Sequence, residues 1–176
     1  MSTLRRNFLT YLMPVLTVIL ILSLVVIAGF RLYTQLGTIT NAMIVDHVEE
    51  LTDIFQRIDK ECQIIGFEHE KNNIDFLNVV KFVGSEIGSM NLANPSNWQG
   101  PYVKDNPTVQ EKQYVVVVTK DGYYIAPGDG IELANGKVIG KDIIITKDSD
   151  FAQLTGDPEA LQYNDQPMVR KFKNLL

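Results

Sequence analysis

The sequence has a single cysteine, Cys62, and only two histidines, His47 and His69. One cysteine cannot form an intrachain disulfide, so a disulfide-stapled fold is excluded. The two histidines lie in different segments, too far apart to share a metal through local helix geometry. A Gly-x-Ser-x-Gly stretch, a Cys/His pair and a phosphate-loop pattern are also missing. We therefore predict no catalytic residue, no metal site and no cofactor, and a chain that is not an enzyme.

Positive charge is scarce outside the N-terminus. Arg5, Arg6 and Arg31 are the only charged residues among the first 33, which leaves 13 basic against 21 acidic residues in the remainder. An acidic domain without a basic stripe is a poor partner for phosphate backbones. We therefore exclude nucleic acid as a partner.

Charge is absent from residues 8–30, which read FLTYLMPVLTVILILSLVVIAGF. About twenty apolar residues span a bilayer core, and in lipid such a segment must be helical. Residues 1–7 form a basic lead that places the N-terminus in the cytoplasm and residues 31–176 outside. This predicts a single-pass protein of the bacterial inner membrane with a periplasmic or extracellular domain. A cleaved signal peptide and a twin-arginine signal, which RRNFL resembles, are the alternatives.

Helical periodicity extends over residues 38–66, where apolar residues are spaced 4 and 3 apart for three heptads. Two interpretations fit this seam. The helix packs the seam on its own domain, or it also packs it against a second copy in a homodimer. The candidate dimer seam consists of Ile44, Val48, Leu51, Phe55, Ile58 and Cys62.

Two further helical regions are predicted. Residues 71–88 form a second helical stretch, interrupted by glycines, and a loop follows to residue 110. Helix starts are predicted at Asp157 and Asp165, each followed closely by proline. The apolar residues Met168, Phe172 and Leu175 then recur at helical spacing.

The stretch YVVVVTKDGYYIAP at 114–127 predicts a β-hairpin. Four consecutive valines favour a strand buried on both faces, and the turn contains Asp121 and Gly122. A second turn is predicted at Asn135-Gly136, and a short strand at residues 142–146. The pattern gives two strong strands and up to three weaker ones.

Together these segments resemble the extracytoplasmic Cache sensor domains of bacterial chemoreceptors and histidine kinases. The resemblance comprises the basic lead with its apolar helix, the long helix after it, YVVVVTKDGYYIAP, VIGKDI at 138–143, and the acidic TKDSDFAQL. It implies an α+β fold in which a membrane helix continues into a long helix and a PAS-like antiparallel sheet follows. With few strands counted and the chain ending in mid-pattern, we expect the sheet to be incomplete and the domain to be truncated at its C-terminus.

The resemblance also implies the input part of a signal-transduction receptor that binds a small molecule of the amino-acid, organic-acid or amine class. Ligand residues cannot be transferred from the family, so candidates rest on amphipathic aromatics, which often line pockets. They are Trp98, Tyr102 and Tyr124. Because Tyr123 and Tyr124 point to opposite faces of a strand, only one of them can face a pocket.

A second resemblance points to a different class of protein. Trp98-Gln99-Gly100-Pro101-Tyr102 is similar to the W-x-G-P-Y stretch of type II secretion pseudopilins, which also have an apolar N-terminal helix and a small antiparallel sheet. That would make the chain a filament subunit. It departs from the pattern, because Asn7 and Leu12 stand where Gly and Glu are required. A membrane-anchored interaction domain without a small ligand is the third interpretation.

Overall fold

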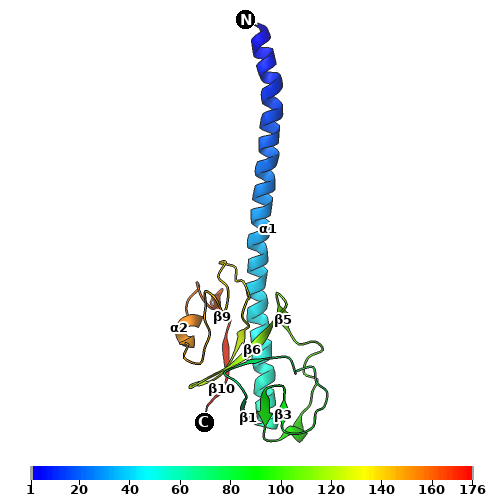
Figure 1. Ribbon diagram of the computed structural model, residues 1–176, viewed down its shortest axis with the longest axis vertical. Helices are drawn as coiled ribbons and strands as arrows, with labels where there is room; N and C mark the ends of the chain where they lie inside the picture. The colour runs from blue at the N-terminus through cyan, green and yellow to red at the C-terminus, as the bar shows by residue number, and fades with distance from the viewer. Residues whose placement is uncertain (1, 176) are drawn as a thin grey trace. The chain divides into compact units, whose positions relative to one another are not determined.

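The computed structural model describes residues 2–175, with side chains from residue 12 onward except at 33, 34 and 36. The chain divides into two units, Met1–Leu36 and Gly37–Leu176. Helix α1 (Ser2–Cys62) begins in the first unit and ends in the second (Figure 1). The side chains of Arg5 and Arg6, which define the predicted basic lead, lie outside the described residues.

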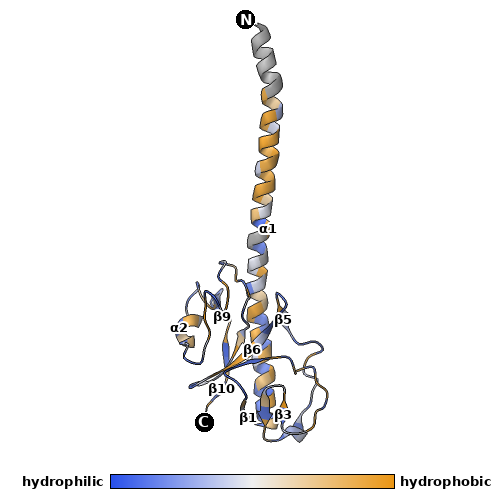
Figure 2. Ribbon diagram, in the orientation of Figure 1, coloured by the Kyte–Doolittle hydropathy of each residue, from blue (hydrophilic) through white to orange (hydrophobic). Residues whose placement is uncertain are grey.

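The first unit is an apolar helical segment. Its large apolar side chains between Leu12 and Leu32 are exposed, and they colour this part of α1 orange in Figure 2. By length and composition, α1 could cross a membrane. Pro14 lies inside the helix. The prediction of a helical segment of membrane-spanning length is thus confirmed.

The second unit is built on a five-stranded antiparallel sheet with the order β10-β7-β6-β2, in which β5 also pairs with β6. The α+β fold class is therefore confirmed, and this sheet has more strands than the two strong ones counted from the sequence. Its strands are β2 (Lys71–Asn73), β5 (Thr108–Val109), β6 (Lys112–Thr119), β7 (Gly122–Pro127) and β10 (Arg170–Asn174).

Smaller elements complete the second unit. A three-stranded sheet has the order β1-β4-β3, and a two-stranded ribbon pairs β8 with β9. The elements are β1 (Ile64–Phe67), β3 (Glu86–Ile87), β4 (Met90–Leu92), a 3-10 helix (Pro95–Asn97), α2 (Phe151–Thr155), β8 (Gln162–Tyr163) and β9 (Gln166–Pro167).

The β6–β7 hairpin forms where the sequence predicts it. Thr119 pairs with Gly122, so Lys120 and Asp121 are the two turn residues. The Thr119 hydroxyl donates to the Gly122 carbonyl at 2.9 Å and accepts from the Asp121 N–H at 3.2 Å. The chain needs glycine at 122, where φ is +146° and where a Cβ would lie 2.2 Å from the Lys173 carbonyl oxygen.

The heptad seam of α1 is the centre of the core within a single chain. Phe55 lies 5.0 Å from Phe172 of β10 and 6.2 Å from Phe76, centroid to centroid. The six seam residues Ile44, Val48, Leu51, Phe55, Ile58 and Cys62 have no exposed surface. They are therefore unavailable as a dimer contact in this arrangement, and the seam serves the first of its two interpretations, packing on its own domain.

The face of the sheet that points away from α1 is covered by the segment from Gly128 to Leu161. On β6, Tyr114 contacts His47 of α1, so Val115 and Val117 point to the other face. Both valines are buried, and Phe151 of this segment stacks on Tyr124 of β7. The segment contributes its own buried residues, Ile131, Leu133, Ile139, Ile143, Ile145 and Leu161.

The prediction of a helix over residues 71–88 was wrong. Residues 71–73 form β2, which pairs with β6, and the following segment is irregular until β3. Gly84 and Gly88 have φ of +97° and +56°, which a helix does not accommodate. Sheet pairing with the valine-rich strand β6 outweighs the weak helical pattern.

The predicted helices near the C-terminus are also absent from the described residues. Asn164 and Asp165 have φ of +49° and +61° and form the turn of the β8–β9 ribbon. Met168 and Phe172 are buried as predicted, but through an extended strand that pairs with β7. The Asp142–Thr146 strand is reduced to a bridge at Ile143, and the one short helix here is α2, capped by Asp150.

Candidate functional site

Two hollows lie along β10, between this strand and α1. The first, which we call the Tyr124 hollow, has a volume of about 630 Å³ and is lined from α1, β7, α2 and β10. Its lining residues are Thr52, Asp53, Gln56, Tyr124, Phe151, Ala152, Thr155, Pro167, Val169, Arg170 and Lys171. The hollow therefore brings together residues that are more than a hundred positions apart in the sequence.

An aromatic pair forms one wall of the Tyr124 hollow. The rings of Tyr124 and Phe151 are 4.2 Å apart and inclined by 15°, and the Lys171 ammonium lies 5.7 Å from the Tyr124 ring centroid. Phe151 is held there because Asp150 caps α2 by accepting from the Gln153 N–H at 3.1 Å. Burial, with Asp121 and Asp150 nearby, raises the pKa of the Tyr124 hydroxyl, so this hydroxyl remains a hydrogen-bond donor to higher pH than an exposed tyrosine.

Charges of both signs face the same hollow. Arg170 bonds through Nη1 to the Glu49 carboxylate at 3.3 Å, and its buried Nε has no hydrogen-bond partner among the described residues. Asp53 of α1 and Lys171 of β10 are exposed and in no ion pair that the structure describes. The hollow can thus offer a cation to a carboxylate and a carboxylate to an amine.

The second, the Tyr123 hollow, measures about 710 Å³. Lys173 lines this hollow, and its Nζ donates to the Asp59 carboxylate at 2.6 Å and to the Ile64 carbonyl. The rings of Tyr123 and Phe172 stack with their centroids 5.9 Å apart. Burial raises the pKa of the Tyr123 hydroxyl, and the nearby charge of Asp59 raises it further. The lining residues are Asp59, Lys60, Gln63, Ile64, Ile65, Ala93, Tyr123, Lys173, Asn174 and Leu175.

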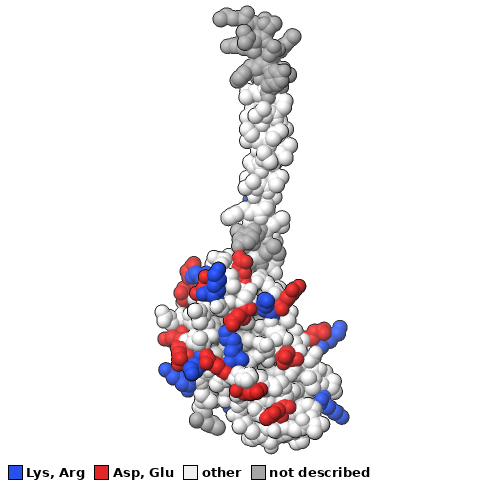
Figure 3. All heavy atoms as spheres, viewed as in Figure 1, with Lys and Arg blue, Asp and Glu red and all other residues white. Residues whose placement is uncertain are grey.

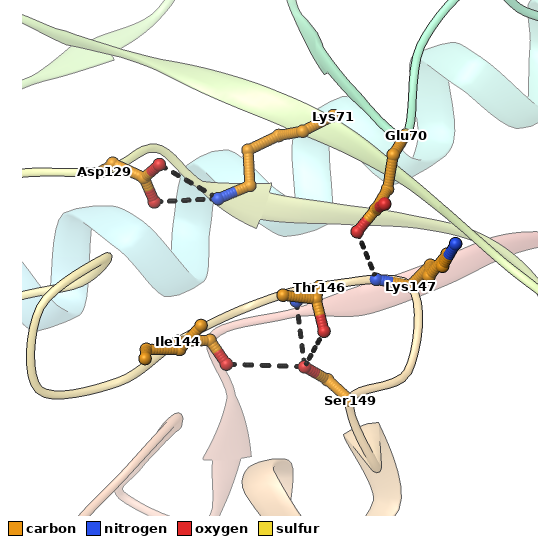
Figure 4. A network of polar contacts seen from close by, with 7 residues as sticks. All are labelled: Glu70, Lys71, Asp129, Ile144, Thr146, Lys147 and Ser149. Atoms are coloured by element: carbon orange, nitrogen blue, oxygen red, sulfur yellow. Dashed lines mark hydrogen bonds and ion pairs between the residues drawn. The ribbon is translucent and has the colours of Figure 1, made fainter.

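A third hollow of about 430 Å³ lies at β2 and β6. Its main polar contact is the ion pair between Lys71 Nζ and both carboxylate oxygens of Asp129, at 2.8 and 3.0 Å (Figure 4). In the same view the Lys147 N–H donates to Glu70 Oε1 at 2.7 Å. These contacts attach the segment from Gly128 to Leu161 to the start of β2. The polar residues of this hollow therefore have a structural role.

The structure separates the three aromatic residues predicted to bind a ligand. Tyr124 lines a hollow, whereas Trp98 and Tyr102 line none of the three. The prediction that only one of Tyr123 and Tyr124 faces a pocket was wrong, because each of them lines a different hollow. Trp98 packs edge-on against Tyr102 at 4.7 Å and donates from Nε1 to the Val79 carbonyl at 3.0 Å. The Arg57 guanidinium covers the Tyr102 ring at 4.8 Å. Both aromatics therefore fix the loop that precedes β5 rather than form part of the Tyr124 hollow.

Sequence reasoning missed the charged part of the Tyr124 hollow. Arg170 and Lys171 lie within the predicted C-terminal helix, and Asp53 lies in the predicted long helix but outside its apolar seam. The alternation of RKFKN, with one buried aromatic between charged residues, fits an edge strand and was the available signal. Proximity of Asp53 to β10 depends on tertiary packing and has no local signal.

The described residues contain no group of three or more His, Cys, Asp or Glu side chains arranged to hold a metal ion. His47 instead bonds through Nδ1 to the Tyr114 hydroxyl at 3.0 Å, and exposed His69 lies 3.7 Å from Glu68. Figure 3 shows acidic and basic side chains interspersed over the visible face of the second unit. A single-sign patch of the kind that binds nucleic acid is not seen on that face.

Comparisons of the chain with protein-family models, with curated proteins and with solved structures find no match.

Proposed function

We propose that this chain is the extracytoplasmic input part of a bacterial signal-transduction receptor, with a PAS-like domain of the Cache kind anchored in the inner membrane. The α+β domain and the apolar segment of α1 are both compatible with this proposal. Any kinase or other output activity would lie outside this chain. The N-terminus would be cytoplasmic and the domain periplasmic or extracellular.

One observation carries the proposal. The Tyr124 hollow is lined jointly by α1, α2, β7 and β10, so a molecule bound there contacts the long helix and the sheet together. A ligand that prefers one arrangement of α1 against β10 would shift the population of that arrangement. Asp53 and Lys171 supply charges for an amino acid, an organic acid or an amine.

The first test is thermal unfolding of the full chain in detergent micelles, with these three ligand classes added singly. A ligand at a hundred times its Kd should add about 2.7 kcal/mol to the free energy of unfolding. Lys171→Gln should abolish the gain from a carboxylate ligand, and Asp53→Asn the gain from an amine. Lys104→Gln and Asp105→Asn, on an exposed loop, are the matched controls and should leave both gains intact.

If no compound of the three classes stabilises the chain, the sensor proposal fails and a membrane-anchored interaction domain is favoured. The homodimer predicted for a receptor would need an interface other than the six seam residues, because these are buried within one chain.

A pseudopilin-like filament subunit is the second candidate. It is favoured by the 61-residue helix α1, which carries exposed apolar residues between Leu12 and Leu32 and packs its later part against an antiparallel sheet. Electron microscopy of cells expressing the chain would test it. Surface filaments that contain the chain would favour the filament subunit over the sensor. A chain dispersed in the membrane without filaments would favour the sensor.

A further inference from the structure

Strand β10 has an open side. It pairs with β7 along one side, and no described strand pairs with the other. Alternate residues of an antiparallel strand direct their N–H and C=O groups to opposite sides. Part of the β10 backbone therefore faces away from the sheet, where it can receive another strand.

The two hollows lie along β10, and we refer to them together as the trough. The Tyr124 hollow is lined by residues between 52 and 56 of α1 and by 170–171 of β10, and the Tyr123 hollow by residues between 59 and 63 and by 173–174. They thus follow one another along both elements. At the helical rise of 1.5 Å per residue the trough is about 17 Å long, the length of a strand of five or six residues.

Among the described residues, the unpaired charges of the trough are two positive ones, Lys60 and Lys171, and one negative one, Asp53, so positive charge is in excess. Arg170 and Lys173 are paired with Glu49 and Asp59 of α1. Lys60 and Lys171 are exposed and belong to no ion pair within the described part of the chain, and one lines each hollow. A carboxylate-bearing partner would find one available ammonium group in each half of the trough.

The same charges disfavour a second copy of β10 as the occupant. Strand β10 carries Arg170, Lys171 and Lys173 and no acidic residue, so a second copy of β10 would bring the same positive charges to the pair. Like charges directly opposite one another destabilise a sheet, and lysines on edge strands commonly prevent self-pairing. The occupant should therefore be a different, acidic chain.

We propose that this trough binds an extended acidic segment of another protein, which adds to β10 as a further strand. Its carboxylates meet Lys60 and Lys171, and its apolar side chains pack on the aromatic and aliphatic residues Tyr123, Tyr124, Ile64 and Ile65. This interaction goes beyond the sensor function and does not depend on it. A bound segment would also cover the Tyr124 hollow.

The probe is an acetylated, fluorescein-labelled octapeptide of alternating valine and glutamate, added to the full chain in detergent micelles and followed by anisotropy. We expect binding, and binding about tenfold weaker or more for the matching valine–lysine peptide. Two further isomers carry N-methyl groups on all valines or on all glutamates. Each isomer blocks one edge of the peptide strand, so strand addition requires that one isomer loses about tenfold or more in affinity while the other binds.

Variants locate the site. Lys171→Glu and Lys60→Glu should each weaken binding of the valine–glutamate peptide, whereas Lys104→Glu, an equally exposed lysine elsewhere, should not. Far-ultraviolet circular dichroism confirms that each variant is folded. Equal binding of both methylated isomers, equal binding of the lysine peptide, or no binding at all would overturn the proposal. None of these outcomes bears on stabilisation by small ligands, which is measured separately.

Discussion

Tyr114 is a fully buried polar residue at the contact between α1 and the sheet. Its hydroxyl lies 3.0 Å from His47 Nδ1, and the two rings meet edge-on at 5.5 Å. Burial, reinforced by the charge of Asp46, strongly raises the pKa of this hydroxyl. The phenol is thus held in its neutral form where the helix meets the central strand β6.

This burial predicts a loss of stability in alkali. The unfolded chain releases the Tyr114 proton near pH 10, whereas the folded chain retains it. Above that pH the unfolded state binds fewer protons, so the free energy of unfolding falls as pH rises and is unaffected by this group below pH 10. Tyr114→Phe should flatten the fall between pH 10 and 11.5 in urea titrations. Tyr163→Phe, at a half-buried tyrosine, is the control; an equal effect of both substitutions would contradict the assignment.

The pairing of β7 with β10 depends on one glycine. Gly122 and Gly136 both have positive φ, at +146° and +79°, but only Gly122 has a backbone atom against the place of a Cβ. Gly136→Ala should therefore cost about 1 kcal/mol for backbone strain alone. Gly122→Ala must in addition displace β10 and should cost clearly more in urea unfolding. Equal costs for the two substitutions would show that β10 does not lie where the structure places it.

Prediction from sequence succeeded where one local signal decides the element. The valine run and the tight turn after it sufficed for β6 and β7, although the turn residues are Lys120 and Asp121 and Gly122 already belongs to β7. The heptad spacing sufficed for α1 as far as Cys62, after which the last residues of the predicted helix form β1 instead. It failed for β2 and β10, whose residues have weak local preferences and become strands because they pair with β6 and β7. The Tyr124 hollow was predicted only at Tyr124, because its charged residues meet through that pairing.

For the molecule as a whole, we expect the apolar part of α1 to anchor the chain in a membrane. Exposed apolar residues run from Leu12 to Leu32, whereas later in the helix they are few. Leu20→Asp together with Leu24→Asp should release the chain from membranes into the soluble fraction at high pH, since each aspartate at a membrane centre costs about 3 kcal/mol. Ile39→Asp with Met43→Asp has the same spacing in the second unit and should leave the chain bound. Membrane retention of the first double variant would contradict anchoring by this segment.

Cys62 ends α1 with no exposed surface, and burial, with Glu61 nearby, raises the pKa of its thiol. A protonated and inaccessible thiol reacts with neither oxidants nor alkylating reagents while the core is closed. Its rate of modification is therefore set by how often the second unit opens. The rate of Cys62 modification therefore reports how often the core opens where α1 ends and β1 begins. Substances that occupy either hollow would lower this rate.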